Sequence, residues 1–121
     1  MKTRSRLVLM IVALVGLSNT ASFATNYYVE PSSPSTTVNG SLAYPWKTIA
    51  QVNSGTTLLN PGDSVFFKRG QSYSGRLTIS RSGSATAPVV YTNYGTGNLP
   101  EFNNAITDII NITNKQYVVI N

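Results

Sequence analysis

Few residues of this chain could carry acid–base chemistry. It has no histidine and no cysteine, so imidazole catalysis, thiol chemistry and disulfides are absent from this sequence. Glycoside hydrolysis typically needs two carboxylates that face one bond, and the chain has four carboxylate side chains: Glu30, Asp63, Glu101 and Asp108. Asp63 belongs to a Pro-Gly turn and Asp108 to another turn, where acids usually bond local backbone. We therefore expect none of the four to be catalytic, and the catalytic residues stay unknown.

Four basic side chains are the next candidates, because lyases that cleave uronate polymers use a cationic base and a cation that neutralises the sugar carboxylate. They are Lys68, Arg69, Arg76 and Arg81. Cations at strand edges also deter aggregation, and we expect these four to be solvated strand ends. Gly95-x-Gly97 lacks the third glycine of a dinucleotide motif. The sequence predicts no cofactor site and no metal site.

The segment 1–24 is typical of a cleavable signal peptide. Lys2, Arg4 and Arg6 precede an apolar run over 7–15, and Ser22 and Ala24 place small residues where a signal peptidase cuts. Cleavage after Ala24 would leave the next residue, a threonine, as the first of the mature protein. Because the run is about half of the roughly 20 apolar residues that a membrane span needs, we expect no transmembrane anchor. The protein is predicted to be secreted, periplasmic or on the cell surface.

The formal net charge of +5 overstates how basic the exported part is. Three of the nine basic residues leave with the signal peptide, and the remaining six stand against four acidic residues, which gives +2. Only Lys68 and Arg69 are adjacent, so the basic stripe of a nucleic-acid-binding protein is missing. We expect no nucleic-acid partner, and the oligomeric state is left open.

Short β-prone runs separated by turn residues make up most of the exported part. The expected strands are 27–29, 64–68, 76–80, 88–92, 100–102, 109–113 and 117–120. Pro61-Gly62 predicts a tight turn before the second of them. The one segment with helical spacing places Trp46, Ile49 and Ala50 on one side of a short helix over 46–52. Pro45 suits its first helical position.

The spacing of the runs predicts a repeat. Val65, Leu77 and Val89 are evenly spaced along the chain, and two such spacings together suggest a unit of about 23–24 residues, typical of solenoid coils. An immunoglobulin-like sandwich, with a strand about every 8–12 residues, is the structural competitor. The last apolar run, 117–120, ends next to the final residue, so we expect the pattern to be truncated there.

Several segments resemble, in this order, the start of secreted right-handed parallel β-helix proteins of the pectate-lyase-like superfamily. They are Tyr27-Tyr28-Val29, the polar loop 31–40, Pro45-Trp46-Lys47-Thr48-Ile49, 61–70 (PGDSVFFKRG), 73–77 (YSGRL), 87–91 (APVVY) and 94–100 (YGTGNLP). The resemblance covers 27–121. It implies an all-β fold, a right-handed parallel β-helix (solenoid), of which 25–121 would form the N-terminal helical cap and the first coils only.

The same resemblance implies that the full protein acts on extracellular polysaccharide as a lyase or a glycoside hydrolase, with its groove built from later coils. The alternative is a non-catalytic carbohydrate-binding or adhesin-like solenoid, and a third hypothesis is a small sandwich-type binding module that is complete at Asn121. Calcium, in coils that would follow this chain, is the one cofactor that the resemblance allows. The cap gives Trp46 a structural role, because a solenoid must cover its terminal coil, rather than a role in stacking on sugar.

Overall fold

A computed structural model of the chain describes residues 23–104 and 108–121. The signal peptide predicted over 1–24 therefore lies outside the described residues, except for Phe23 and Ala24. None of the helices in the described part is long and apolar enough to span a membrane.

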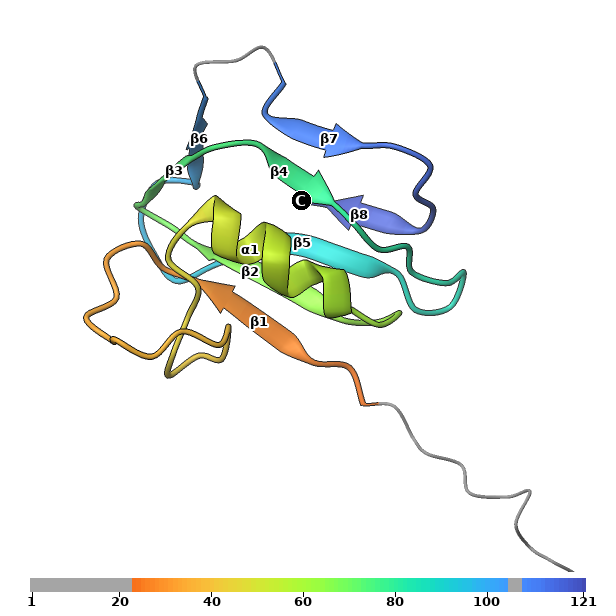
Figure 1. The fold of residues 1–121 in the computed structure, drawn as a ribbon, viewed down its shortest axis with the longest axis horizontal. Coiled ribbons are helices and arrows are strands. Elements are labelled where there is room, and N and C mark those ends of the chain that lie inside the picture. The colour runs from red at the N-terminus through yellow and green to blue at the C-terminus, as the bar shows by residue number, and fades with distance from the viewer. Residues whose placement is uncertain (1–22, 105–107) are drawn as a thin grey trace, which may run out of the picture.

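Short strands dominate the described residues, with one short α-helix among them (Figure 1). In chain order the elements are β1 (Asn26–Val29), α1 (Ile49–Gly55), the 3-10 helix η2 (Thr56–Leu58), β2 (Ser64–Lys68), β3 (Ser72–Ser74), β4 (Leu77–Ile79), β5 (Val89–Tyr94), β6 (Glu101–Asn103), β7 (Ile110–Ile112) and β8 (Val118–Ile120). The predicted strands all occur. β3 was not predicted, because Ser-Tyr-Ser offers a single apolar residue and no alternation to detect.

The strands form three parallel sheets, with the orders β1-β2-β5-β8, β3-β6 and β4-β7. The chain visits the sheets in turn, so that β5, β6 and β7 each lie alongside the corresponding strand of the preceding round, β2, β3 or β4 (Figure 1). Every strand pairing in the described ranges is parallel. The sandwich hypothesis is therefore wrong, because such sandwiches are built from antiparallel sheets.

The pairing registers also correct the predicted repeat length. Val65 pairs with Tyr91, whereas the even spacing had made Val65 equivalent to Val89, two positions earlier. Leu77 pairs with Ile110, so the repeat is longer still in the β4-β7 sheet. The even spacing arose by coincidence, since Val65 and Leu77 belong to different sheets and the turns between the sheets differ in length.

The helix begins later than the sequence predicted. Thr48 is its N-cap: the Thr48 side chain accepts a hydrogen bond from the Gln51 backbone N–H, and the Gln51 side chain accepts one from the Thr48 N–H. This capping box satisfies two N–H groups that a helix start would leave free. Pro45 is therefore not at the first helical position. Trp46 lies in extended backbone that bridges to Val29 of β1.

The apolar core lies between the sheets, and α1 covers one end of it. Ile49 and Val52 are the buried residues of α1, and they belong to the same core cluster as Val65 and Leu77. Ala50, expected on the buried side, is exposed, because the late start of α1 rotates the buried face. The Asn53 side chain fixes α1 to β4. Its Nδ2 donates a hydrogen bond to the Arg76 carbonyl oxygen, next to β4, and its Oδ1 accepts one from the Thr78 N–H within β4.

Candidate functional site

The outer face of the β1-β2-β5 sheet gathers aromatic and charged side chains. Along β2, Val65 and Phe67 are buried, while Phe66 and Lys68 between and after them point outward and are partly exposed. The register places Tyr28 beside Phe66 and Lys68 beside Tyr94. Parallel pairing in register therefore aligns outward residues from three strands that are distant in sequence.

Glu30 and Lys68 form an ion pair at the edge of this face, with Lys68 and Glu30 side chains that are 36% and 20% exposed. The ring of Tyr28 stacks on Phe66 with centroids 5.4 Å apart, and it meets Tyr94 edge-on at 5.2 Å. We call Glu30, Lys68, Tyr28, Phe66 and Tyr94 the outer cluster. Aromatic rings with a few polar groups also line ligand sites, which are usually concave, whereas the three pockets found in the described residues are lined by other side chains.

Burial raises the pKa of Tyr94 to about 12, and the charge of Glu30 contributes to the shift. The phenol therefore remains protonated at neutral pH. Its hydroxyl is buried and has no hydrogen-bond partner in the described residues. In the outer cluster a single carboxylate is paired with a single amine. A glycosidase of the two-carboxylate kind needs a second acid in addition.

The other three carboxylates lie apart from the outer cluster. Asp63 is 1% exposed, and its oxygens accept hydrogen bonds from backbone N–H groups, as its position in the turn predicted. Asp108 faces Arg76, with 3.5 Å between Oδ2 and Nη2, and Glu101 is exposed on β6. No ion pair or hydrogen bond found in the described ranges joins two of the four carboxylates, and no three metal-ligating side chains gather there. That none is catalytic remains a prediction.

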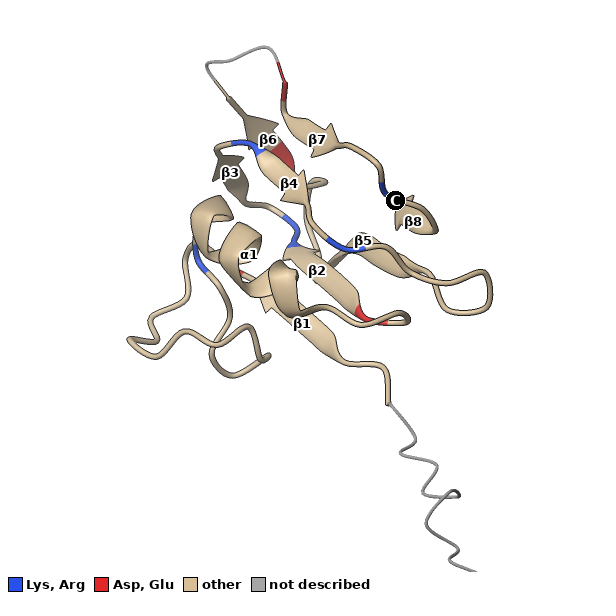
Figure 2. Cartoon of the chain, turned by 45° about the vertical axis from the view of Figure 1, so that its right-hand side comes forward, with Lys and Arg blue, Asp and Glu red and all other residues tan. Residues whose placement is uncertain are grey.

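Figure 2 shows the basic residues scattered over separate elements. Two of the four residues expected to be solvated strand ends are partly buried and have side-chain partners: Lys68 pairs with Glu30, and Arg69 donates from Nε to Oδ1 of Asn93 at 2.7 Å. Arg76 is partly engaged by Asp108, while Arg81 is exposed. The sequence offers one indication of the outer cluster: within 64–68, alternate residues of the predicted strand should face outward. Nothing in the sequence gives the register that brings Glu30 to Lys68.

Trp46 is 6% exposed and contributes to the core. Its ring stacks on Tyr27 with centroids 5.1 Å apart and nearly parallel planes. Two glycines, Gly40 and Gly55, approach the ring so closely that a Cβ on either would clash with it. An indole enclosed in this way has no free face for a sugar ring, which agrees with the predicted structural role.

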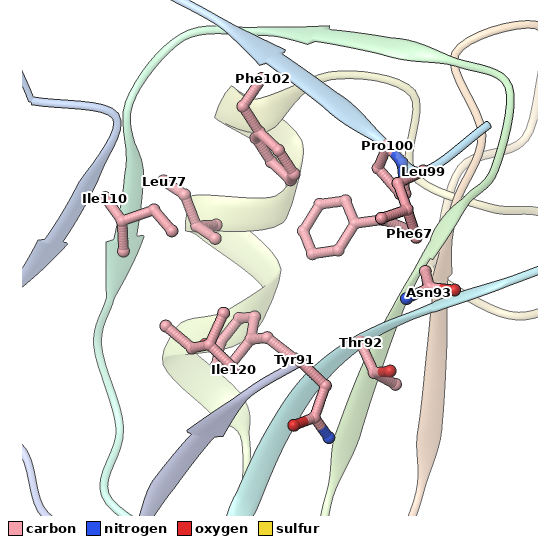
Figure 3. Close-up of a pocket in the computed structure, with 11 residues that line it drawn as sticks. Phe67, Leu77, Tyr91, Thr92, Asn93, Leu99, Pro100, Phe102, Ile110 and Ile120 are labelled. Atoms are coloured by element: carbon pink, nitrogen blue, oxygen red, sulfur yellow. The ribbon is translucent and has the colours of Figure 1, made fainter.

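An apolar pocket of about 170 Å³ opens between the sheets at the end of the core opposite α1 (Figure 3). The rings of Phe67 and Phe102 and the side chains of Leu77, Ile110 and Ile120 line it, and α1 lies behind them in the view of Figure 3. Its lining includes no charged side chain among the described residues. The pocket is thus a continuation of the core and not a catalytic cavity.

Comparisons with known proteins find no matching protein-family model and no matching curated protein. Among solved structures, the chain is similar to the native GH136 lacto-N-biosidase from Eubacterium ramulus, with a TM-score of 0.54 and 28% identity over 60% of this chain. The selenomethionine derivative of that protein gives a TM-score of 0.50 and 26% identity over the same share. The match spans 12% of the length of the lacto-N-biosidase chain. These likenesses are to a glycoside hydrolase, and the resemblance to pectate-lyase-like proteins is not confirmed by them.

Proposed function

We propose that the chain is the start of an exported, right-handed parallel β-helix protein that acts on carbohydrate as a glycoside hydrolase. The observation that carries the proposal is the similarity to GH136 lacto-N-biosidase, which includes 28% identity as well as backbone shape. The predicted signal peptide supports export, because polymeric and surface glycans are met outside the cell. The likeness favours hydrolysis over the lyase reaction that the sequence had left open.

The order of the strands supports the β-helix. Successive strands enter three parallel sheets in rotation, and parallel crossover connections are right-handed in nearly all proteins. α1 covers one end of the core, while Ile110 and Ile120 are exposed beside the apolar pocket at the other end. A further coil, continuing the three sheets beyond β8, would cover that end. We place the catalytic residues, and any calcium, in such coils.

The outer cluster fits a supporting role in carbohydrate binding. Its rings are partly exposed beside an ion pair that can exchange hydrogen bonds with sugar hydroxyls. In a β-helix the outer face of one sheet runs continuously along successive coils. A glycan bound at later coils could therefore extend onto this face.

The test is an assay of the full-length protein on a panel of neutral glycans, including oligosaccharides that end in lacto-N-biose, and of polyuronates. We expect hydrolytic release of sugar from a neutral glycan. Release of unsaturated uronates alone would show a lyase instead. Absence of any released sugar across the panel would overturn the proposed enzyme function.

A second candidate function is carbohydrate binding without hydrolysis. It is favoured by the arrangement of the four carboxylates, which the described contacts keep in separate places. The same glycan panel separates the two: a binder retains intact glycan and releases nothing. Replacing Phe66 by Ala should then weaken glycan retention, whereas replacing exposed Leu58, which lies on η2 and outside the outer cluster, should leave it unchanged.

A further inference from the structure

Asp63 is a buried carboxylate with no basic partner among the described residues. It is 1% exposed, and the two ion pairs found in the described ranges involve other acids. Its Oδ1 accepts a hydrogen bond from the Thr25 N–H at 2.8 Å, and its Oδ2 accepts one from the Asn60 N–H at 2.9 Å. These bonds satisfy the oxygens but bring no full positive charge, and a buried charge without a counter-charge is costly.

The nitrogen of Thr25 is held at Asp63 by the sheet itself. The Thr25 carbonyl oxygen accepts the Ser64 N–H at 3.0 Å, and the next residue, Asn26, opens the ladder between β1 and β2 opposite Ser64. These contacts lie at or after Thr25. The position of its nitrogen therefore does not depend on the residues before it.

Thr25 is also the residue that the cleavage pattern predicts as the first of the mature protein. Ser22 and Ala24 supply the small side chains of the cleavage site, and Ala24 is exposed. Hydrolysis of the Ala24–Thr25 peptide bond breaks the C–N bond and adds water. The hydroxyl goes to the Ala24 carbonyl carbon, and the Thr25 nitrogen takes up protons to become an α-ammonium group.

We propose that cleavage after Ala24 creates an ion pair between the Thr25 α-ammonium and the buried carboxylate of Asp63, so that export processing completes the folded state. The inference rests on the export part of the proposed function. The bond from the Thr25 nitrogen to the carboxylate then has a charge on the donor as well as on the acceptor, which makes it an ion pair and strengthens it. Moving the amino terminus by one residue displaces it by about 3.3–3.6 Å, enough to separate the ammonium from Asp63.

The test uses the full-length exported protein in two forms, one that begins at Thr25 and one that retains Ala24. Each form is made with Asp63 and with Asp63→Asn, and the melting temperatures of the four proteins are compared. We expect retention of Ala24 to lower the melting temperature by several degrees with Asp63, and by far less with Asp63→Asn. Glu101→Gln, at an exposed carboxylate on β6, is the matched control and should leave the cost of retention unchanged.

A second measurement covers the case in which Asp63→Asn does not fold. The pKa of the terminal α-amine, measured by NMR, should be higher in the form that begins at Thr25 than in the form that retains Ala24, because the paired carboxylate favours the ammonium. Equal values of this pKa would overturn the ion pair.

The outcomes separate the inference from the export proposal. Terminal sequencing that finds an uncleaved chain would refute export. A mature protein that begins at Thr25 would support export. If retention of Ala24 then lowers the melting temperature equally with Asp63 and with Asp63→Asn, the ion pair is refuted and export stands. A mature terminus at any other residue would also refute the ion pair.

Discussion

Two buried tyrosines differ in what their hydroxyl groups meet. Tyr73 and Tyr91 are 1% and 2% exposed. The Tyr73 hydroxyl donates to the Lys68 carbonyl oxygen at 2.9 Å and lies 3.2 Å from that of Val29. The Tyr91 hydroxyl is buried without a hydrogen-bond partner in the described residues. Hydrogen bonds therefore compensate for the burial of the Tyr73 hydroxyl, whereas the burial of the Tyr91 hydroxyl is uncompensated among the described residues.

We therefore predict opposite effects of the same substitution. Tyr73→Phe should lower the free energy of unfolding by about 1 kcal/mol, because a buried hydrogen bond is lost. Tyr91→Phe should leave it unchanged or raise it by up to about 1 kcal/mol, because an unsatisfied hydroxyl is removed. Urea denaturation of the full-length variants measures both. A larger loss for Tyr91→Phe than for Tyr73→Phe would contradict this account.

Tyr91 also makes stability depend on pH in alkaline solution. Burial raises its pKa to about 12, against a smaller opposing effect of the nearby Thr56 hydroxyl, which is too poorly placed for a full hydrogen bond. The usual value is about 10, so the folded state holds the phenolic proton more tightly than the unfolded state. This contribution to stability is complete below pH of about 10 and is lost as the pH rises to about 12. Tyr91→Phe should make the fall in the free energy of unfolding less steep in that range, and an unchanged slope would contradict the prediction.

At the residue scale, the sequence indicated hydrogen bonds between residues that are close in the chain, but not contacts between residues that are distant in it. The Pro61-Gly62 turn predicted that Asp63 bonds nearby backbone, and it does so through Asn60. The pairing of Glu30 with Lys68 joins residues 38 positions apart. It depends on which strands become neighbours and in what register, and neither property is encoded in the local pattern of residues.

At the scale of elements, α1 shows how a strong local signal can mislead. Pro45 and the apolar spacing predicted a start at Trp46, yet Thr48 and Gln51 form a capping box that places the start at Ile49. The capping pattern was present in the sequence. Trp46 instead joins β1 through an extended bridge, since tertiary packing of the indole outweighs the local preference for helix.

The end of α1 packs against this indole. A substitution there can show whether helix propensity or side-chain packing has the larger effect on stability. Alanine favours helix over glycine by about 1 kcal/mol, so Gly55→Ala would stabilise an isolated helix. Here a Cβ on Gly55 would lie 2.0 Å from Cζ2 of Trp46. We predict a net loss of about 1–3 kcal/mol in the free energy of unfolding, as in overpacked cores.

The matched control for Gly55→Ala is the double variant with Trp46→Leu. A smaller side chain at 46 leaves room for the added methyl group, so the cost of Gly55→Ala should shrink or change sign in that background. The measurement is a double-mutant cycle by denaturant unfolding. An increase in stability for Gly55→Ala alone would contradict the close packing.

At the scale of the whole molecule, the two ends of the core differ. α1 covers one end, and Asn53 ties it to β4 through hydrogen bonds of 2.8 and 2.9 Å. At the other end Ile120 is 44% exposed beside the apolar pocket. The parallel arrangement was expected from the resemblance to β-helix proteins, because the spacing of the short strands alone had left an antiparallel sandwich open. The coil lengths were not, because they depend on turns whose conformations tolerate different numbers of residues.

This asymmetry predicts the behaviour of residues 25–121 made on their own. In repeat proteins each unit is stabilised by its neighbours, and about three stacked units are needed to bury a core. The exposed apolar end should therefore bind a hydrophobic dye, and the segment should lose its β signal in circular dichroism gradually on heating. If the proposed further coil covers this end, the full-length protein should bind little dye and melt cooperatively. A sharp melting transition of monomeric 25–121, independent of its concentration, would show that these residues form a self-sufficient domain and that no further coil is needed.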